Sequence, residues 1–393
     1  MVALQVALCA IPALCPTSGG EGELKKEQFL KSRVAELRPD LLTEVNAPDP
    51  RVPSGIRPTL VAKWKGADSS RTLWIMTHTD VVPPGEASLW TGDPWTARVQ
   101  DGKIYGRGVE DNQQSLVASF FALKACLAEK VRFPLDVGLM FMADEETGSA
   151  LGMAHVMDHT DLVRPGDLLV VPDGGSEDGG EVEIAEKGGA WIRVRTRGRQ
   201  CHASTPQLGV NAFRAASALV VSLDGLYQEF PQSNPTFDPP VSTFEPTKKE
   251  PNVPNVNTIP GDDVFHVDCR VLPEIPLAEV VAAVRRRADA VEQKYGVKID
   301  VEPGKLSHAA PPTPPDAPVV RLTTEALRTV YGVEPRLLGI GGGTVAAFPR
   351  RKGLPAVVIG RNRSMAHQPD EFCVIDYMIG DAKVFARMMG AAG

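Results

Sequence analysis

The sequence predicts an α/β protein in which a larger domain, a mixed β-sheet flanked by helices, carries a smaller inserted α+β domain. Apolar runs such as residues 73–76 are typical of buried strands, and they alternate with helical patterns. Residues 191–197 instead alternate strictly, with arginines on one face, as in a half-exposed antiparallel strand. Because 393 residues exceed what one compact core usually holds, we expect residues 1–186 and 306–393 to form one domain and residues 187–305 the inserted one.

The composition is that of a water-soluble globular protein. Hydrophobic residues make up 43% of the chain and charged residues 23%, and the formal net charge of −7 gives no reason to expect nucleic acid as a partner. The six cysteines are widely spaced without a Cys-x-x-Cys pair, which favours reduced thiols. The apolar start lacks a preceding Lys or Arg, and no segment suits a bilayer span. We therefore expect a cytoplasmic protein without a membrane partner.

The larger domain is predicted from short strands and amphipathic helices. Its expected helices are residues 1–15, 23–37, 116–128 and 319–331, and its expected strands are residues 59–64, 72–77, 135–142, 168–171, 335–340 and 356–359. The Gly-rich turn at residues 341–344 is expected to lead into one more helix.

The inserted domain is predicted to follow a β-α-β-β-α-β order, close to the ferredoxin-like motif. Its expected strands are residues 191–197, 241–244, 264–272 and 297–301, and its expected helices are residues 211–227 and 277–295. The two crossings, near Glu186 and at residues 303–315, are rich in Gly or Pro, so we expect them to act as hinges.

The stretch around which the chain is organised is His78-Thr79-Asp80, directly after the apolar run at residues 73–76. Buried parallel strands end where α/β sheets bind their ligands. In an extended His-x-Asp both side chains lie on one face, so the carboxylate can receive the second ring N–H of a metal-bound imidazole. A histidine satisfied near a sheet edge is the alternative explanation for this motif alone.

Further acids and a histidine follow other apolar runs or stand in Gly-rich loops. They are Asp111, the run Asp144-Glu145-Glu146, Asp173 and His367. Asp111 precedes a strong helical pattern, so a plain helix N-cap is its alternative role. Three consecutive acids need solvent, a metal or one raised pKa. Carboxylate and imidazole ligands collected in this way suit zinc, cobalt or manganese.

These motifs together resemble the M20 metallopeptidase family, which includes acetylornithine deacetylase, succinyl-diaminopimelate desuccinylase, aminoacylase and glutamate-releasing carboxypeptidase. The resemblance rests on Thr77-His78-Thr79-Asp80-Val81-Val82-Pro83, on Tyr105-Gly106-Arg107-Gly108-Val109-Glu110-Asp111, on residues 144–148, and on Ala366-His367. It runs in order through nearly the whole chain and implies a metallopeptidase catalytic domain with an inserted lid and dimerisation domain.

The resemblance also implies a role for each residue of the metal site. It implies two divalent ions, usually zinc, with cobalt or manganese as alternatives. His78 and Asp173 would hold one ion, Glu146 and His367 the other, and Asp111 would bridge them. Asp80 would orient His78, and Glu145 would be the general base that moves the proton of an attacking water.

The inserted domain carries further residues that resemble functional positions of the family. His202 matches a histidine that stabilises the oxyanion, often across a dimer interface, although a structural turn histidine is its alternative. Asn257 matches a substrate-contacting asparagine, and Arg270 an arginine that binds a substrate carboxylate. Alternation places Arg270 on the polar strand face with Asp268, so an Arg270–Asp268 surface pair is the competing interpretation.

A Gly-rich loop is the last predicted substrate contact. Gly342, Gly343 and Thr344 resemble a substrate-binding loop at a helix start, where backbone N–H groups can bind an anion. Many relatives carry an acid after this Thr or Ser, whereas this chain has Val345. That departure bears on the deacylase assignment and leaves the metal chemistry untouched.

The sequence thus leads us to expect a two-metal amidohydrolase that cleaves the amide of an N-acyl-amino acid, as acetylornithine deacetylase or succinyl-diaminopimelate desuccinylase does. A dipeptidase or aminopeptidase on the same site is the alternative enzyme, and a catalytically inactive binding protein is the alternative from another class. The presence of Glu145 beside all five ligand residues argues against an inactive protein. We also expect a homodimer formed through the inserted domain.

Overall fold

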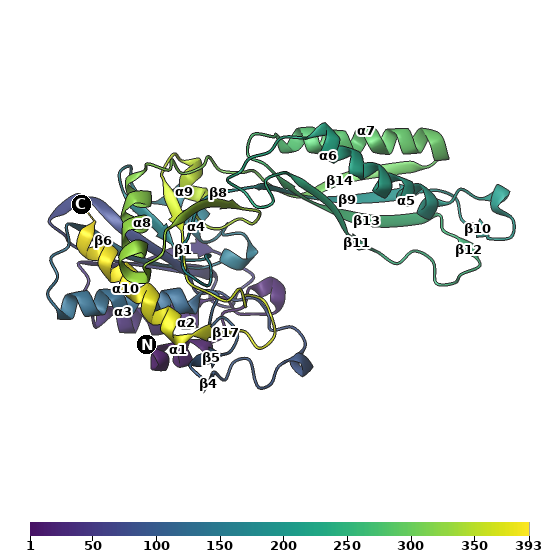
Figure 1. Cartoon of the computed structure of the whole chain (residues 1–393). Coiled ribbons are helices and arrows are strands. Elements are labelled where there is room, and N and C mark those ends of the chain that lie inside the picture. Colours follow the sequence, from purple (N-terminus) through teal and green to yellow (C-terminus); the bar gives the residue numbers. More distant parts are fainter. Residues whose placement is uncertain (393) are drawn as a thin grey trace. The chain divides into compact units, whose positions relative to one another are not determined.

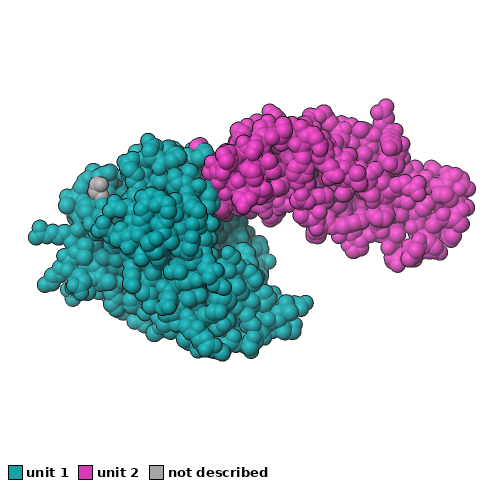
Figure 2. All heavy atoms as spheres, in the orientation of Figure 1, with its two compact units in different colours: residues 1–184, 312–338, 344–393 teal, residues 185–311, 339–343 magenta. Residues whose placement is uncertain are grey.

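The computed structural model describes residues 1–392, and they form two compact units, shown in different colours in Figure 2. Unit 1 comprises Met1–Ile184, Pro312–Leu338 and the chain from Thr344 onward, and unit 2 comprises Ala185–Pro311 with Gly339–Gly343. Unit 2 therefore includes a short segment, residues 339–343, that lies outside the predicted range 187–305 of the inserted domain. Each unit is described by itself.

Unit 1 is built around a mixed eight-stranded sheet in the order β1-β2-β6-β3-β7-β16-β8-β15. Three of these strands, β1, β6 and β8, are labelled in Figure 1. The strands are β1 (Leu41–Pro48), β2 (Ile56–Trp64), β3 (Asp68–His78), β6 (Leu135–Met142), β7 (Leu168–Val171), β8 (Glu181–Glu186), β15 (Arg336–Ile340) and β16 (Ala356–Val358). Strand β3 is parallel to β6 and β7, and β7 is parallel to β16, whereas β2 is antiparallel to β1 and β6. The predicted α/β class with a mixed sheet is confirmed.

Helices pack on both faces of this sheet, which explains why its central strands contain continuous apolar runs, such as residues 73–76 of β3 and residues 137–142 of β6. Leu73 and Ile75 of β3 belong to one buried cluster together with residues of α3, α8 and α10, while Trp74 and Met76 belong to a second cluster with residues of α4. The helices of unit 1 are α1 (Val2–Cys9), α2 (Leu24–Ala35), α3 (Gln113–Ala128), α4 (Met153–His159), α8 (Pro318–Tyr331), α9 (Ala347–Arg351) and α10 (Ile375–Ala391). A small sheet is formed by β4 (Arg98–Gln100), β5 (Lys103–Tyr105) and β17 (Phe372–Val374).

Unit 2 is a four-stranded antiparallel sheet in the order β11-β13-β9-β14, with helices on one face (Figure 1). Its elements are β9 (Gly188–Arg197), β10 (Cys201–His202), α5 (Ala212–Ser222), α6 (Leu226–Glu229), β11 (Thr243–Lys249), β12 (Thr258–Ile259), β13 (Asp262–Val271), α7 (Leu277–Tyr295) and β14 (Lys298–Ser307). Ile192, Val194 and Val267 share a buried cluster with residues of α5 and α7. The long strands and helices follow the β-α-β-β-α-β order.

Two further observations concern the whole described chain. Among residues 1–392, no helix combines the length and the apolar character that a membrane crossing requires. All six cysteines are present as free thiols.

Candidate metal centre

The predicted metal ligands of unit 1 meet at the carboxyl ends of neighbouring parallel strands. His78 is the last residue of β3, Asp144 to Glu146 follow the end of β6, and Asp173 follows β7. In the sheet, His78 lies beside Met142, the last residue of β6. This is the edge of an open α/β sheet at which ligands bind. Asp111, ahead of α3, and His367, between β16 and β17, complete the group.

The carboxylate of Asp111 lies between the two histidines. Its Oδ1 atom is 2.9 Å from Nε2 of His78, and its Oδ2 atom is 3.3 Å from Nε2 of His367. Nε2 of His78 is also 3.5 Å from Oδ1 of Asp173, and Nε2 of His367 is 3.0 Å from Oε2 of Glu146. Each histidine therefore pairs with one acid of its own and shares Asp111 with the other.

This donor set fits divalent cations. Two groups have ligand atoms within 4.8 Å of one another: His78 with Asp111 and Glu146, and His78 with Glu145 and Asp173. Four carboxylates and two imidazoles in so small a volume carry excess negative charge, and oxygen and nitrogen donors suit zinc or manganese. Because Glu145 belongs to the second group, distance alone does not separate a base from a ligand at this position.

The crowding is also visible in the pKa values. Burial, followed by the charge of Asp173, raises the pKa of Glu145 well above its usual range, and burial raises the pKa of Glu146 to about 7. Burial would raise the pKa of Asp111 too, but hydrogen bonds from His367 and His78 hold it below its usual value. Hydrogen bonds to Asp111 and Glu146 raise the pKa of His367 to about 10. The cluster of carboxylates and histidines therefore favours positive charge among its members, as a bound cation would supply.

Asp80 contacts both His78 and the acidic turn, which is the segment Asp144-Glu145-Glu146. Its backbone carbonyl lies 3.1 Å from Nδ1 of His78 and its Oδ1 atom lies 3.4 Å from the same nitrogen, so Nε2 is left to face the carboxylates. The Asp80 carboxylate also accepts hydrogen bonds from the backbone N–H groups of Glu145 (3.1 Å) and Glu146 (3.0 Å). The second contact was not expected from the sequence.

Two glutamates that the sequence analysis did not single out connect the loops of Asp111 and His367 reciprocally. Glu371 accepts hydrogen bonds from Nη1 of Arg107 and from the backbone N–H groups of residues 108, 110 and 111, at 2.7 to 3.1 Å. Glu110 accepts from the backbone N–H groups of residues 363, 365 and 366. Each loop therefore supplies a carboxylate that fixes the backbone of the other. The only sequence signal was an extra acid close to each predicted ligand.

Asn112, also missed, positions a ligand directly. Its Nδ2 group donates to Oδ1 of Asp173 at 2.8 Å and to the carbonyl of Pro172 at 2.7 Å. The peptide bond between Asp111 and Asn112 is cis.

Unit 2 holds the predicted substrate residues in two separate places. His202 and Asn257 are neighbours, because β10 pairs with β12 and the N–H of Ala203 donates to the carbonyl of Asn257 at 2.9 Å. Nδ1 of the exposed His202 accepts a hydrogen bond from the N–H of Ser204 at 3.1 Å. Arg270 lies near the opposite end of β13, where its Nη1 donates to the carbonyl of Gly341 at 3.1 Å.

The Gly-rich loop leads into a helix, as the sequence predicts, but its residues lie ahead of the first helical turn. Helix α9 begins at Ala347 and has five residues, so Gly342, Gly343 and Thr344 precede it without forming its first turn. Oγ1 of Thr344 accepts from the N–H of Ala346 at 3.1 Å. The local turn around Thr344 satisfies that donor, and the helix-dipole argument for anion binding by this loop does not apply.

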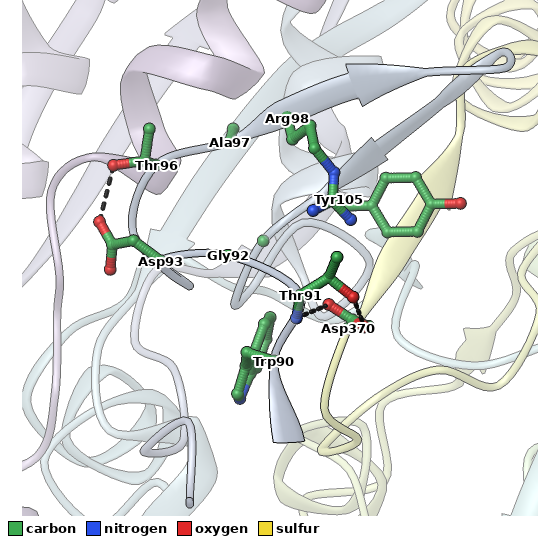
Figure 3. A pocket seen from close by; sticks show the side chains of 10 residues that line it. Trp90, Thr91, Gly92, Asp93, Thr96, Ala97, Arg98, Tyr105 and Asp370 are labelled. Atoms are coloured by element: carbon green, nitrogen blue, oxygen red, sulfur yellow. Dashed lines mark hydrogen bonds between the residues drawn. The ribbon is translucent and has the colours of Figure 1, made fainter. Parts of the chain in front are cut away.

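Unit 1 also contains a pocket of about 440 Å³ that includes none of the predicted site residues (Figure 3). Its lining comprises Trp90, Thr91, Gly92, Asp93, Thr96, Ala97, Arg98, Tyr105, Gly106 and Asp370. Asp370 accepts hydrogen bonds from the N–H and Oγ1 of Thr91 at 2.9 and 2.5 Å, and the Arg98 guanidinium stacks on the Tyr105 ring at 4.7 Å. The loop that carries His367 is thereby attached to the loop around Trp90.

The geometry can be compared with known proteins. The chain is 36% identical to uncharacterized metallohydrolases of Methanococcus maripaludis and Methanocaldococcus jannaschii, over 99% of this chain and 98% of each relative. It is 28% identical to a succinyl-diaminopimelate desuccinylase of Cereibacter sphaeroides, over 94% of this chain and 93% of that enzyme.

Solved structures show the same fold. Human carnosine dipeptidase 1 superposes with a TM-score of 0.78 at 20% identity, covering 99% of this chain and 95% of that one. The M20 metallo-carboxypeptidase Sso-CP2 of Sulfolobus solfataricus gives 0.77 at 19% identity, covering 99% and 98%. A dinuclear metal-binding M20 peptidase of Bacillus subtilis gives 0.68 at 14% identity, covering 99% and 96%.

The model of one protein family matches most of the chain. The matching residues are 74–391, which contain every ligand position described above, and the family's description is peptidase family M20/M25/M40. The chain is therefore a metallohydrolase that belongs to peptidase family M20/M25/M40.

Proposed function

We propose that this protein is a two-metal amidohydrolase that releases the amine and the carboxylate of an N-acyl-amino acid. The proposal rests mainly on the Asp111 carboxylate, because its Oδ1 atom lies beside Nε2 of His78 and its Oδ2 atom lies beside Nε2 of His367. His78 and Asp173 would hold one ion, Glu146 and His367 the other, and Asp111 both. Zinc is our first choice of metal, with cobalt or manganese as alternatives.

When bound, the two ions would polarise the scissile carbonyl and lower the pKa of the attacking water. The chain supplies the proton transfer through Glu145. Its backbone is fixed by Asp80, and its carboxylate has no hydrogen-bond partner among residues 1–392. It is thus available to accept the water's proton and to donate it to the leaving amine.

The acyl-amino acid substrate is supported by Arg270 and by the sequence similarity to a desuccinylase. Arg270 and the segment Gly341 to Gly343 belong to the same unit and are in contact, so both can bind one carboxylate of the substrate. Asn257 and His202 would contact the amide that is cleaved.

A homodimer is supported by the separation of these residues within unit 2. Arg270 follows Asp262 by eight positions along β13, which corresponds to about 27 Å at the usual rise of an antiparallel strand. His202 and Asn257 lie beyond the Asp262 end, because β12 directly precedes β13. An N-acyl-amino acid is much shorter than this distance. We therefore propose that unit 2 acts as a lid and dimer surface, with His202 serving the active site of the partner subunit.

A hydrolysis screen tests this function. Metal-free protein is reloaded with zinc, cobalt or manganese and assayed on N-acetyl-amino acids, N-succinyl-amino acids and dipeptides, with Glu145→Gln as the matched control. We expect turnover of acylated amino acids that depends on metal and is lost in the control. Turnover of dipeptides alone would favour the dipeptidase or aminopeptidase alternative, and absence of turnover with any metal would contradict the proposal.

A further inference from the structure

The open face of the unit 2 sheet carries two arginine–aspartate pairs of the same geometry. In one, Nε and Nη2 of Arg195 donate to the two carboxylate oxygens of Asp262 at 2.9 and 3.2 Å. In the other, Nε and Nη2 of Arg270 donate to the two oxygens of Asp268 at 2.7 and 3.1 Å. Only the second pair has additional contacts that hold both partners, and this difference suggests a function.

Asp268 is held from the neighbouring strand. Trp191 lies opposite it on β9, and the indole Nε1 donates to Oδ2 of Asp268 at 2.8 Å. Both oxygens of Asp268 are therefore engaged, one by Arg270 alone and one by Arg270 together with Trp191. A carboxylate with three donors on it has little rotational freedom, so it holds the guanidinium plane at a fixed angle.

Arg270 is left with unused donors on an accessible side. A guanidinium has five N–H groups, and three are used: two on Asp268 and one on the carbonyl of Gly341. Within residues 1–392 the structure records no partner for the remaining two, one on Nη1 and one on Nη2. The side chain is 38% exposed.

The space beside Arg270 is open because its neighbour on β9 is Gly189. A Cβ atom added there would have Ser307 Cβ, at 4.0 Å, as its nearest contact, so no side chain fills this part of the face. Gly341, whose carbonyl accepts from Nη1 of Arg270, begins the segment of three glycines that we propose as part of the substrate site. Arg270 therefore adjoins an open part of the sheet face and a loop whose backbone a ligand can approach closely.

We propose that Asp268, anchored by Trp191, is a positioning residue that orients Arg270 so that its free N–H groups on Nη1 and Nη2 bind the carboxylate of the substrate. The inference rests on the proposed function, because it assigns Arg270 to that carboxylate. Orientation before binding removes the cost of ordering a side chain with many rotamers. An ordinary exposed pair, such as Arg195–Asp262, would have no such effect on substrate.

The experiment compares one substrate in two forms, with a free α-carboxylate and with that carboxylate amidated, and uses the ratio of the two kcat/KM values as its readout. We expect Asp268→Asn to lower the acid-to-amide ratio about tenfold, mainly through KM on the acid form. Trp191→Phe, which removes one anchor of Asp268, should lower the ratio by a smaller factor. Asp262→Asn is the matched control and should keep the ratio of the wild type.

The outcomes separate this inference from the proposed function. A wild-type enzyme that prefers the acid form, together with an Asp268→Asn variant that keeps the same preference, would overturn the positioning role and leave the proposed function standing. A wild-type enzyme with equal rates on both forms would overturn the assignment of the carboxylate itself. If Asp268→Asn does not fold, as judged by circular dichroism, an unchanged ratio in Trp191→Phe overturns the positioning role.

Discussion

Arg57 is a buried residue that contacts Asp144, the first residue of the acidic turn at the metal centre. Replacing Arg57 should therefore lower the free energy of unfolding. Its side chain is fully buried, and Nε donates to Oε2 of Glu23 at 2.5 Å. Nη1 lies 3.3 Å from Oδ1 of Asp144 and 3.5 Å from Oδ2 of Asp49. One guanidinium thus neutralises three acids, one of which directly precedes Glu145 and Glu146.

The expected magnitude follows from this arrangement. Arg57→Gln leaves Glu23 and Asp144 buried without their cation, and loss of one partner of a buried ion pair costs about 3–5 kcal/mol. Arg51 provides a matched control, because it also contacts Asp49 through two nitrogens, at 2.7 and 2.9 Å, but its side chain is 52% exposed. Arg51→Gln should cost about 1 kcal/mol or less.

Urea denaturation followed by tryptophan fluorescence, with divalent metal removed, would measure both changes. Asp144 fixes the turn that carries Glu145 and Glu146, because its carboxylate accepts hydrogen bonds from Thr147 Oγ1 at 2.5 Å and from the N–H of Leu151 at 2.9 Å. The metal content of reloaded protein, measured after gel filtration, should therefore also fall in Arg57→Gln. If Arg57→Gln and Arg51→Gln lose stability equally, the argument from burial is refuted.

Three further predictions follow from other parts of the molecule. Glu145→Gln should keep its metal content and lose about 100-fold or more in kcat, and near-normal turnover would exclude Glu145 as the general base. If His202 acts in the partner's site, mixing His202→Ala with Glu145→Gln subunits should restore about a quarter of wild-type activity, whereas exchanged subunits without activity would contradict that role. Burial raises the pKa of Asp381 to about 6, above the value near 4 expected in the unfolded chain. The native state therefore binds the carboxyl proton of Asp381 more tightly than the unfolded state does. As the pH rises from about 4 to 6, the free energy of unfolding should fall by up to about 3 kcal/mol. Asp381→Asn should lack this loss. If the free energy of unfolding falls equally with pH in the variant and the wild type between about pH 4 and 6, the raised pKa of Asp381 is contradicted.

Much of the fold was predictable because local signals and tertiary structure agree. The apolar run before His78, the strand at residues 135–142 and the helix at residues 277–295 have buried faces that their own spacing indicates. Helix α10 was not predicted. It begins without a side-chain cap and contains Gly380 and Gly390, which lower helix propensity, so it depends on packing against α3 and α8.

The edges of the sheet were harder to predict. Strand β1 lies at one edge and is mostly half-buried, without a clear alternation of polar and apolar residues, and it ends at Pro48. The interactions between loops had no local signal at all. Glu110 contacts the backbone of Arg363, 253 residues away, and only the folded chain brings these groups together.

In the candidate site, too, local sequence signals predicted the residues, whereas contacts between distant segments could not be predicted. The ligand types and their positions after apolar runs were visible in the sequence, and the structure brings His78, Asp111, Glu146, Asp173 and His367 together. The second contact of Asp80, the reciprocal glutamates Glu110 and Glu371, and the attachment of Asp268 to Trp191 each depend on pairings between distant segments.

The metal content of the protein tests the central claim most directly. Elemental analysis after loading and removal of excess ions should give about two divalent ions per wild-type chain, because Asp111 lies between two separate sets of ligands. The double variant His78→Ala, His367→Ala should bind neither ion tightly while remaining folded by circular dichroism. Retention of both ions by this variant would contradict the ligand assignment, and with it the proposed two-metal centre.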